Sequence, residues 1–307
     1  MNRSALVCAL QARPQGLAWL GVILAVLCWG GNALVARALH EQISPLALAF
    51  WRWALALALL APFVWRSAWV HREALRRAGW RLAVLAVPSI TCFNTLLYAA
   101  ARTTEAVNIT LVNTCLPLVA FVASGVLLRE WPGRRAWAGL LLAATGLVYL
   151  LAQGSLARLL ALEFRLGDLT MLLAISLWAL YTVLLRRWRA YLELPPMLLL
   201  AALIVLGLPP LLPFYLHELL GGARFVPDLA NLAAIGYTAV FASLLAYLCW
   251  NHGVRVLGAA RASMASYLMP VFTALFGWLL LGEHLAAYHW IGGGVILAGL
   301  LLASSRP

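Results

Sequence analysis

Residues 108–121, NITLVNTCLPLVAF, place two amides, two hydroxyls and a proline inside a long apolar run. Polar groups and helix breakers are unusual in hydrocarbon, where a helix has to satisfy its own backbone. Thr110, Asn113, Thr114 and Pro117 follow the i, i+3, i+4, i+7 spacing and therefore share one face of a helix. We expect this face to line a polar cavity. The alternative is that it only forms hydrogen bonds between neighbouring helices.

The composition indicates that this helix lies in a membrane. Of 307 residues, 64% are hydrophobic and 10% are charged, with a mean hydropathy of +0.92. Soluble domains are about half apolar and about a quarter charged. Several apolar runs reach the roughly 20 residues that cross a bilayer. We predict an all-α membrane protein whose ten transmembrane helices occupy residues 17–39, 45–65, 81–101, 105–128, 133–152, 168–188, 195–217, 230–252, 258–281 and 286–304.

The net charge of +12 is a topology signal, because every basic residue is an arginine and the arginines are unevenly distributed. Outside the spans, the outer connections hold only Arg102, Arg158, Arg165 and Arg224. The opposite side holds Arg3, Arg13, Arg66, Arg72, Arg76, Arg77, Arg81, Arg129, Arg134, Arg135, Arg186, Arg187, Arg189, Arg255, Arg261 and Arg306. By the positive-inside rule, both termini are predicted to be cytoplasmic. No nucleic-acid partner is expected.

An internal repeat divides the chain into residues 1–153 and 154–307. An offset of about 153 residues aligns NITLVNTCLPLVAF with RASMASYLMPVFTA at 261–274 and Pro117 with Pro270. An offset of about 149 residues aligns Trp29 with Trp178. Each half would have five spans, and an odd number inverts the second half. Inverted repeats recur in secondary transporters, which bind substrate near the membrane midplane.

The predicted binding site consists of aromatic, amide and hydroxyl side chains near the middle of the spans. Tryptophans normally gather at membrane interfaces, so those at mid-span either line a site or only pack against neighbours. Pro117 and Pro270 are expected to kink their helices. The candidate substrate-binding residues are Trp29, Asn32, Asn94, Tyr98, Asn113, Thr114, Trp178, Tyr181, Tyr247, Ser266 and Tyr267.

Other residues have simpler expected roles. Arg52 is expected to extend along its stem to the interface, with pairing to a substrate carboxylate as the alternative. Gly139, Gly146, Gly299 and the run Gly292 to Gly294 should allow close helix packing. The cysteines have no paired spacing and no CxxC or HExxH pattern occurs, so neither a metal nor another cofactor is expected. All acids lie in loops or at span ends, which favours facilitated diffusion.

The chain resembles the EamA-type transporters of the drug/metabolite transporter superfamily. CWGGN in the first span, NTCLPL and YLMPVF, and the ends of the two halves, LLREWPGRRAWAGLLLAATG and LLLGEHLAAYHWIGGGVILAG, carry the resemblance. It implies a multi-pass protein of the bacterial inner membrane that exports a small metabolite through a cavity between spans 1, 3, 4, 6, 8 and 9. The aromatic lining is similar to that of aromatic amino acid exporters, so aromatic or neutral amino acids are the expected substrates.

Two alternatives remain. A drug or nucleotide-sugar carrier of the same superfamily would have the same fold, but a nucleotide-sugar requires several cationic groups in the cavity, and only Arg52 and Arg37 qualify, because the other arginines lie in loops or at span ends. An integral-membrane enzyme would need acid–base or metal groups. The spans contain no cluster of His, Asp and Glu, so we expect no enzymatic activity.

Overall fold

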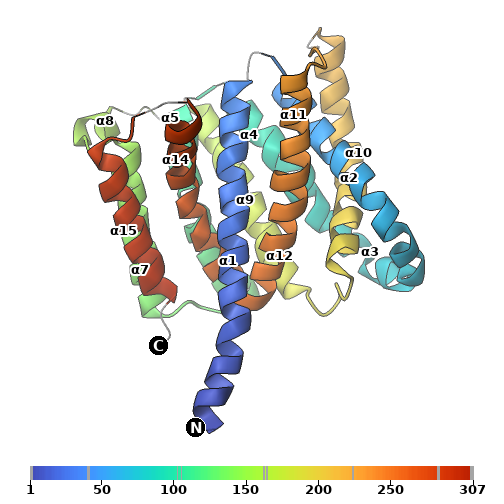
Figure 1. The fold of residues 1–307 in the computed structure, drawn as a ribbon, viewed down its shortest axis with the longest axis horizontal. Coiled ribbons are helices and arrows are strands. Elements are labelled where there is room, and N and C mark those ends of the chain that lie inside the picture. Colours follow the sequence, from blue (N-terminus) through green and yellow to red (C-terminus); the bar gives the residue numbers. More distant parts are fainter. Residues whose placement is uncertain are drawn as a thin grey trace.

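The computed structural model describes residues 3–39, 42–101, 103–104, 106–161, 163, 165–222, 225–281 and 284–304. Throughout these ranges the regular structure is helical, with no strand (Figure 1). The elements are α1 (Arg3–Ala38), α2 (Pro45–Val70), α3 (Arg72–Ala86), η1 (Val87–Cys92), α4 (Phe93–Ala101), α5 (Ala106–Asn113), α6 (Leu116–Leu128), α7 (Arg134–Leu151), α8 (Leu156–Leu160), α9 (Leu166–Arg187), α10 (Pro196–Leu220), α11 (Leu229–Tyr237), η2 (Thr238–Leu245), α12 (Ala246–Leu257), α13 (Ala259–Met264), η3 (Ala265–Leu268), α14 (Met269–Leu281) and α15 (Ala287–Ser304).

The helices are those of a membrane protein. Eight helical stretches in the described chain are long and apolar enough to cross a bilayer. Large apolar side chains such as Phe63, Leu220 and Leu301 are exposed on the outside of the bundle, where only lipid could cover so much apolar surface. The prediction of an all-helical membrane protein is confirmed. The expected spans at 133–152 and 286–304 correspond to α7 and α15, which have 18 residues each and are not among the eight.

Glycines bring α7 and α15 into close contact, and the two helices run antiparallel. A Cβ on Gly139 would lie 2.5 Å from the carbonyl oxygen of Gly299, and one on Gly146 would lie 2.9 Å from that of Gly292. The expected packing role is therefore confirmed for these four glycines. It is wrong for Gly294, which has no neighbouring atom within 4 Å because it lies on the opposite, exposed face of α15.

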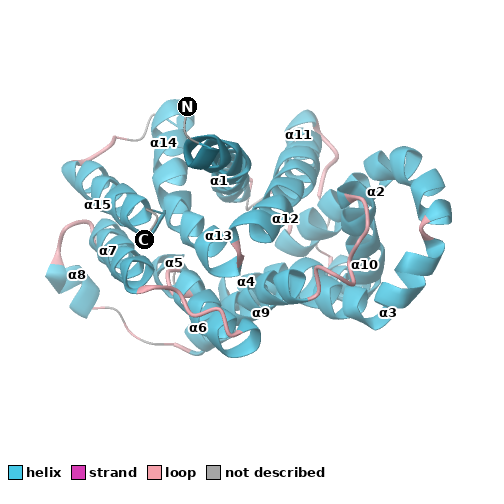
Figure 2. Ribbon diagram, turned by 90° about the horizontal axis from the view of Figure 1, so that it is seen from below, coloured by secondary structure: helices cyan, strands magenta, loops and turns pink. Residues whose placement is uncertain are grey.

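Most of the other close helix pairs also join the two halves of the chain. Viewed from below, α2 lies beside α10, α1 beside α12, and α7 beside α15 (Figure 2). Helix α9 contacts α4 and α6 of the first half, while α1 contacts α12 and α14 of the second. Exchanging the halves thus maps one set of contacts onto the other. The main core of buried residues runs through both halves, and a smaller buried cluster joins the start of α2 to α10 and α11.

Four of the membrane helices contain irregular segments. Two are π-helices, η1 between α3 and α4 and η2 between α11 and α12. The other two precede the expected kink prolines. A turn at residues 114–115 separates α5 from α6, and the 3₁₀ helix η3 precedes α14. Pro117 and Pro270 each lie in the first turn of the following helix, where the missing N–H leaves no helical hydrogen bond unmade.

Candidate functional site

A cavity of about 500 Å³ opens between the two halves of the bundle. Its size falls within the range of small-molecule sites, about 300–1,000 Å³. It is bounded by α1, α4, α5, α9 and α14, and its mouth lies where α7 ends and α15 begins. The lining residues are Ala33, Leu97, Ile109, Thr110, Asn113, Gln153, Met171, Met269, Pro270, Thr273, Ala274, His284, Leu285, Tyr288 and His289.

Neutral amides and hydroxyls supply much of the polarity of this cavity. Thr110 and Asn113 lie one turn apart on α5, as the shared face predicted, and Thr273 faces them from α14. The buried side-chain oxygen of Asn113 has no hydrogen-bond partner in the described chain. At the mouth, His289 accepts a hydrogen bond through Nδ1 from the main-chain N–H of Ala286. The described lining contains no carboxylate and no guanidinium group.

A dense aromatic cluster lies one helical turn from the cavity wall on α1. We use the name aromatic cluster for Trp29, Trp53, Phe93, Trp178, Tyr181, Tyr247 and Trp250. The ring centres of Trp29 and Trp178 are 5.4 Å apart, and the rings meet edge to face. The ring of Tyr247 lies 5.5 Å from that of Trp178. Trp29 lies one helical turn before Ala33 of the cavity wall, so the cluster begins next to the cavity.

Hydrogen bonds hold the cluster to the π-helices of both halves. The hydroxyl of Tyr247 donates to the carbonyl oxygen of Ser89 in η1 over 2.9 Å, and Nε1 of Trp29 donates to that of Ala242 in η2 over 3.0 Å. A π-helix shifts its main-chain bonds by one residue and leaves carbonyls for other donors. The hydroxyl of Tyr181 donates to Oδ1 of Asn251 over 2.6 Å. The cluster is therefore positioned as well as packed.

Arg52 supports the same region and does not extend to the interface. It is 4% exposed, and its Nε donates to Oγ of Ser243 over 2.9 Å. Its Nη2 donates to the carbonyl oxygen of Ala242 over 3.3 Å. Its guanidinium carbon lies 5.0 Å from the ring centre of Trp53. The expected extension along the stem is wrong, because η2 offers a carbonyl and a hydroxyl within the protein.

The structure distributes the sequence-predicted residues over several environments. Among the candidate binding residues whose side chains the structure describes, Asn113 alone lines the cavity, and the kink residue Pro270 lines it too. Trp29, Trp178, Tyr181 and Tyr247 form most of the aromatic cluster. Asn94, Thr114 and Tyr267 are buried outside the cavity, while Asn32 and Ser266 are half-buried outside it. The side chains of Tyr98 and Arg37 lie outside the described part of the structure.

Several lining residues were not predicted. Thr273 follows Pro270 by three residues, so the helical spacing that selected Ser266 and Tyr267 could also have found it. Gln153, His284 and His289 come from the ends of helices and connections. These residues come together because α7 packs on α15. The local sequence of the connections does not predict that they meet.

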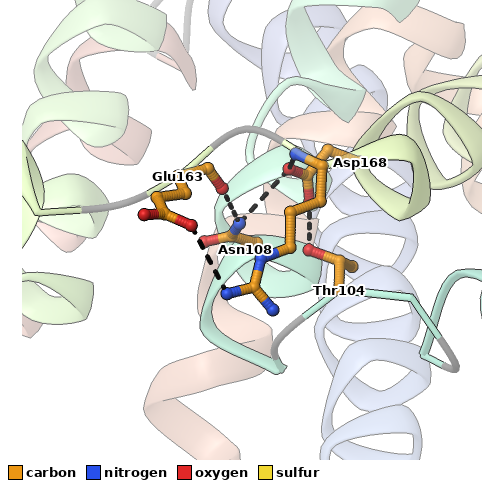
Figure 3. A network of polar contacts seen from close by, with 5 residues as sticks. Thr104, Asn108, Glu163 and Asp168 are labelled. Atoms are coloured by element: carbon orange, nitrogen blue, oxygen red, sulfur yellow. Dashed lines mark hydrogen bonds and ion pairs between the residues drawn. The ribbon is translucent and has the colours of Figure 1, made fainter.

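A buried carboxylate ties α9 to α5 and to the turn before it (Figure 3). Asp168 is 2% exposed. It accepts hydrogen bonds from Oγ1 of Thr104 over 2.6 Å, from Nδ2 of Asn108 over 3.2 Å and from the main-chain N–H of Arg165 over 2.7 Å. Nδ2 of Asn108 also donates to the carbonyl oxygen of Glu163. Because its acceptors are occupied by donors, this acid anchors the helix end.

A bundle of membrane-spanning helices around a partly polar cavity, whose described lining has no carboxylate and no guanidinium group, is the arrangement expected of a membrane transport protein. The sequence profile of the EamA-like transporter family matches residues 16–152 and 165–305, so the chain belongs to that family of membrane transporters.

Similar proteins agree with this assignment. An uncharacterized transporter of Archaeoglobus fulgidus is 29% identical, over 92% of this chain and 96% of its own length. The uncharacterized transporter YyaM of Bacillus subtilis is 27% identical, over 90% of this chain and 89% of its own length. A solved crystal structure superimposes with a TM-score of 0.76 at 19% identity, covering 94% of this chain and 98% of that one, and shows the same fold.

Proposed function

We propose that this transporter exports small metabolites, with aromatic or neutral amino acids as its substrates, by alternating access at a cavity near the membrane midplane. The observation that carries the proposal is the lining of amides and hydroxyls around Asn113, whose buried side-chain oxygen has no partner in the described chain. A substrate ammonium group would supply the missing donor. The apolar side chains of Ile109, Met171 and Met269 would accommodate a flat side chain.

Alternating access requires two conformations related by the symmetry of the fold. In the proposed architecture, ten spans form two inverted repeats at residues 1–153 and 154–307. The antiparallel pairing of α7 with α15 supports it, because equivalent helices of inverted halves have to run in opposite directions. Irregular segments at equivalent positions, η1 with η2 and the breaks before Pro117 and Pro270, support it as well.

The proposed orientation places both termini in the cytoplasm and the cavity mouth on the outer side of the bacterial inner membrane. It rests on the excess of arginines at the opposite end of the bundle. In this orientation the cavity is open outward and the aromatic cluster is the closed inner barrier. Substrate would be released from this state during export, and the inward-open state would load it.

The alternatives fit the cavity less well. A nucleotide-sugar carries a diphosphate, whereas no arginine lines the described cavity and Arg52 already bonds to η2. A lipophilic drug would leave the amides and hydroxyls without partners. Enzymatic acid–base chemistry would need a catalytic group in the cavity. His289 is the candidate with a described bond, but it lies at the mouth and accepts from Ala286.

Counterflow into vesicles tests these functions directly. Purified protein in liposomes loaded with unlabelled phenylalanine should take up labelled phenylalanine and leucine. Neither a labelled nucleotide-sugar nor a lipophilic cationic drug should exchange when it is present on both sides. Exchange of the drug alone, or chemical conversion of any of these compounds, would overturn the proposed substrate class.

A further inference from the structure

Arginines stacked on aromatic rings join the two halves at the end of the bundle that lies opposite the cavity mouth. We call Arg77, Trp80, Arg81, Trp188 and Tyr191 the Arg81 cluster. The guanidinium carbon of Arg81 lies 4.1 Å from the ring centre of Tyr191 and 4.9 Å from that of Trp80. The rings of Trp80 and Trp188 meet edge to face at 5.1 Å. Helix α3 therefore contacts the connection between α9 and α10 here.

The arginines of this cluster form no ion pair among the described residues. Nη1 of Arg81 donates to the carbonyl oxygen of Arg77 over 3.4 Å, but its buried Nε has no partner within the described residues. Arg72, Arg76 and Arg77 are exposed, and none of these arginines forms an ion pair in the described chain. A buried N–H without an acceptor costs about 1–3 kcal/mol. The site therefore calls for an anionic oxygen ligand.

The surroundings of the cluster place it at the depth of lipid head groups. Trp65, Trp69, Trp80 and Tyr191 are exposed around it, and Trp and Tyr gather where hydrocarbon meets water. Two more arginines lie over these rings, Arg66 over Trp65 and Arg72 over Trp69, with guanidinium carbons 5.2 and 5.1 Å from the ring centres.

A bend in α3 separates its basic start from its apolar continuation. The bend is at Gly79, where φ is +30°, a conformation that side chains disfavour. The segment before it carries Arg72, Arg76 and Arg77 on its exposed side and buries Ala78, as expected of a helix lying on the membrane surface. Beyond the bend, Leu82 and Leu85 are buried in the bundle.

We propose that the Arg81 cluster binds the head group of an anionic phospholipid. The phosphodiester would accept from the guanidinium groups of Arg81 and Arg77, as arginine and phosphate commonly pair. The exposed face of Trp80 would contact the start of an acyl chain. A lipid bound in this way bridges α3 of the first half and the α9–α10 connection of the second. The inference does not depend on which substrate the cavity carries.

Native mass spectrometry of the purified full-length protein measures this binding. Phosphatidylglycerol should bind more tightly than phosphatidylcholine with the same acyl chains. In Arg81→Gln, the Kd for phosphatidylglycerol should rise about five-fold, which corresponds to about 1 kcal/mol for one arginine at a membrane surface. The matched control is Arg134→Gln, an equal loss of charge at the exposed start of α7. Its Kd should change less than two-fold.

Two further measurements keep the test decisive. If Arg81→Gln fails to fold, Arg77→Gln and Tyr191→Leu should each weaken phosphatidylglycerol binding while the melting temperature stays unchanged. Inorganic phosphate should not displace the lipid when it is compared with sodium chloride at the same ionic strength. Equal binding of the two lipids, an equal loss in Arg134→Gln, or displacement by free phosphate would each overturn the proposed lipid site.

Discussion

Asn113 and Asn108 lie on the same helix, but their amides are in different environments. Asn113 presents a buried oxygen without a partner in the described chain to the cavity. Asn108 also has a buried side-chain oxygen without a partner in the described chain, but it does not line the cavity, and its Nδ2 donates to Asp168 and to the carbonyl oxygen of Glu163. Because they share the residue type and α5, they form a matched pair for separating a binding role from a structural one.

Replacing Asn113 by alanine should affect transport and leave the fold nearly intact. No hydrogen bond of its side-chain oxygen is lost, so the free energy of unfolding should change by less than about 0.5 kcal/mol. Phenylalanine counterflow per folded molecule should fall about tenfold, as expected for one lost hydrogen bond of about 1.4 kcal/mol to a charged group. Asn108→Ala should instead lower the melting temperature, with unchanged counterflow per folded molecule. The opposite pattern would make the Asn113 face structural.

Trp178 is expected to contribute mainly to stability. Its ring lies 5.3 Å from those of Phe93 and Tyr181, and the side chain is 5% exposed. Trp178→Ala should cost about 3–5 kcal/mol through the space left in the cluster. Trp178→Phe should retain the fold and, if the cluster is the closed inner barrier, still exchange leucine and phenylalanine. Thermal melting of both variants checks this. A wild-type melting temperature for Trp178→Ala would contradict a packed cluster.

The sequence patterns predicted which side chains share a helix face better than they predicted what surrounds each side chain. Helical spacing grouped Thr110 with Asn113, and both line the cavity, but it also placed Thr114 and Pro117 on that face, and a turn at residues 114–115 ends the helix before them. The same reasoning could not show that Trp29 approaches Trp178 to 5.4 Å, a distance set by packing between distant parts of the chain. Mid-span tryptophans can line a cavity or fill one, and here they fill the space below it.

At the scale of elements, the apolar runs located the helices well and the irregular segments less well. The breaks near Pro117 and Pro270 have a local cause in the missing proline N–H. The π-helix η1 contains Pro88, whereas η2 contains no proline at all. Carbonyl oxygens of both π-helices accept hydrogen bonds from side chains of the other half, Tyr247 and Trp29, so tertiary contacts contribute to these irregular segments and the local sequence alone does not predict them.

The packing of α7 on α15 leads to a prediction that can be tested against a control glycine on the same helix. A Cβ on Gly299 would lie 2.5 Å from the main-chain nitrogen of Ala143, while one on Gly294 would meet nothing within 4 Å. Gly299→Ala should therefore push the helices apart and cost about 1–3 kcal/mol. Gly294→Ala, on the exposed face of the same helix, should be neutral or slightly stabilising. Thermal melting in detergent compares them, and equal melting temperatures would refute the close contact.

At the scale of the whole molecule, the two ends of the bundle differ in charge and shape. Helix α8 lies at the upper end of Figure 1, while the start of α3 and the N-terminal part of α1 lie at the lower end. The arginine distribution predicts which end faces the cytoplasm, but the direction of each helix within the bundle comes from the structure.

Labelling with an impermeant thiol reagent checks the orientation. In a variant without native cysteines, Ser155→Cys and Gly221→Cys should react in intact cells. Arg76→Cys and Trp188→Cys should react only after the cells are broken. The physical reason is the greater cost of moving arginine-rich loops across the membrane during insertion. Labelling of position 76 but not of position 155 in intact cells would reverse the proposed topology.

Transport is expected to run down the substrate gradient without a proton. The buried Asp168 already accepts three hydrogen bonds at a helix end, and the other acids lie in loops or at span ends. Proton-linked carriers usually hold a titratable group inside the membrane. A pH gradient across substrate-equilibrated vesicles should therefore produce no accumulation of phenylalanine. Accumulation that a proton ionophore abolishes would show coupling instead.

The pairing of α7 with α15 also constrains how the chain is made. On the ribosome, α7 is completed before α8 to α14 and long before the helix that covers its glycine face. Until α15 is inserted, the close-packing surface around Gly139 and Gly146 has only lipid as a neighbour. A nascent chain that stops before α15 would therefore show an unmatched helix to the membrane quality-control machinery. The packing of the first half is therefore complete only when α15, the last helix of the second half, has been inserted.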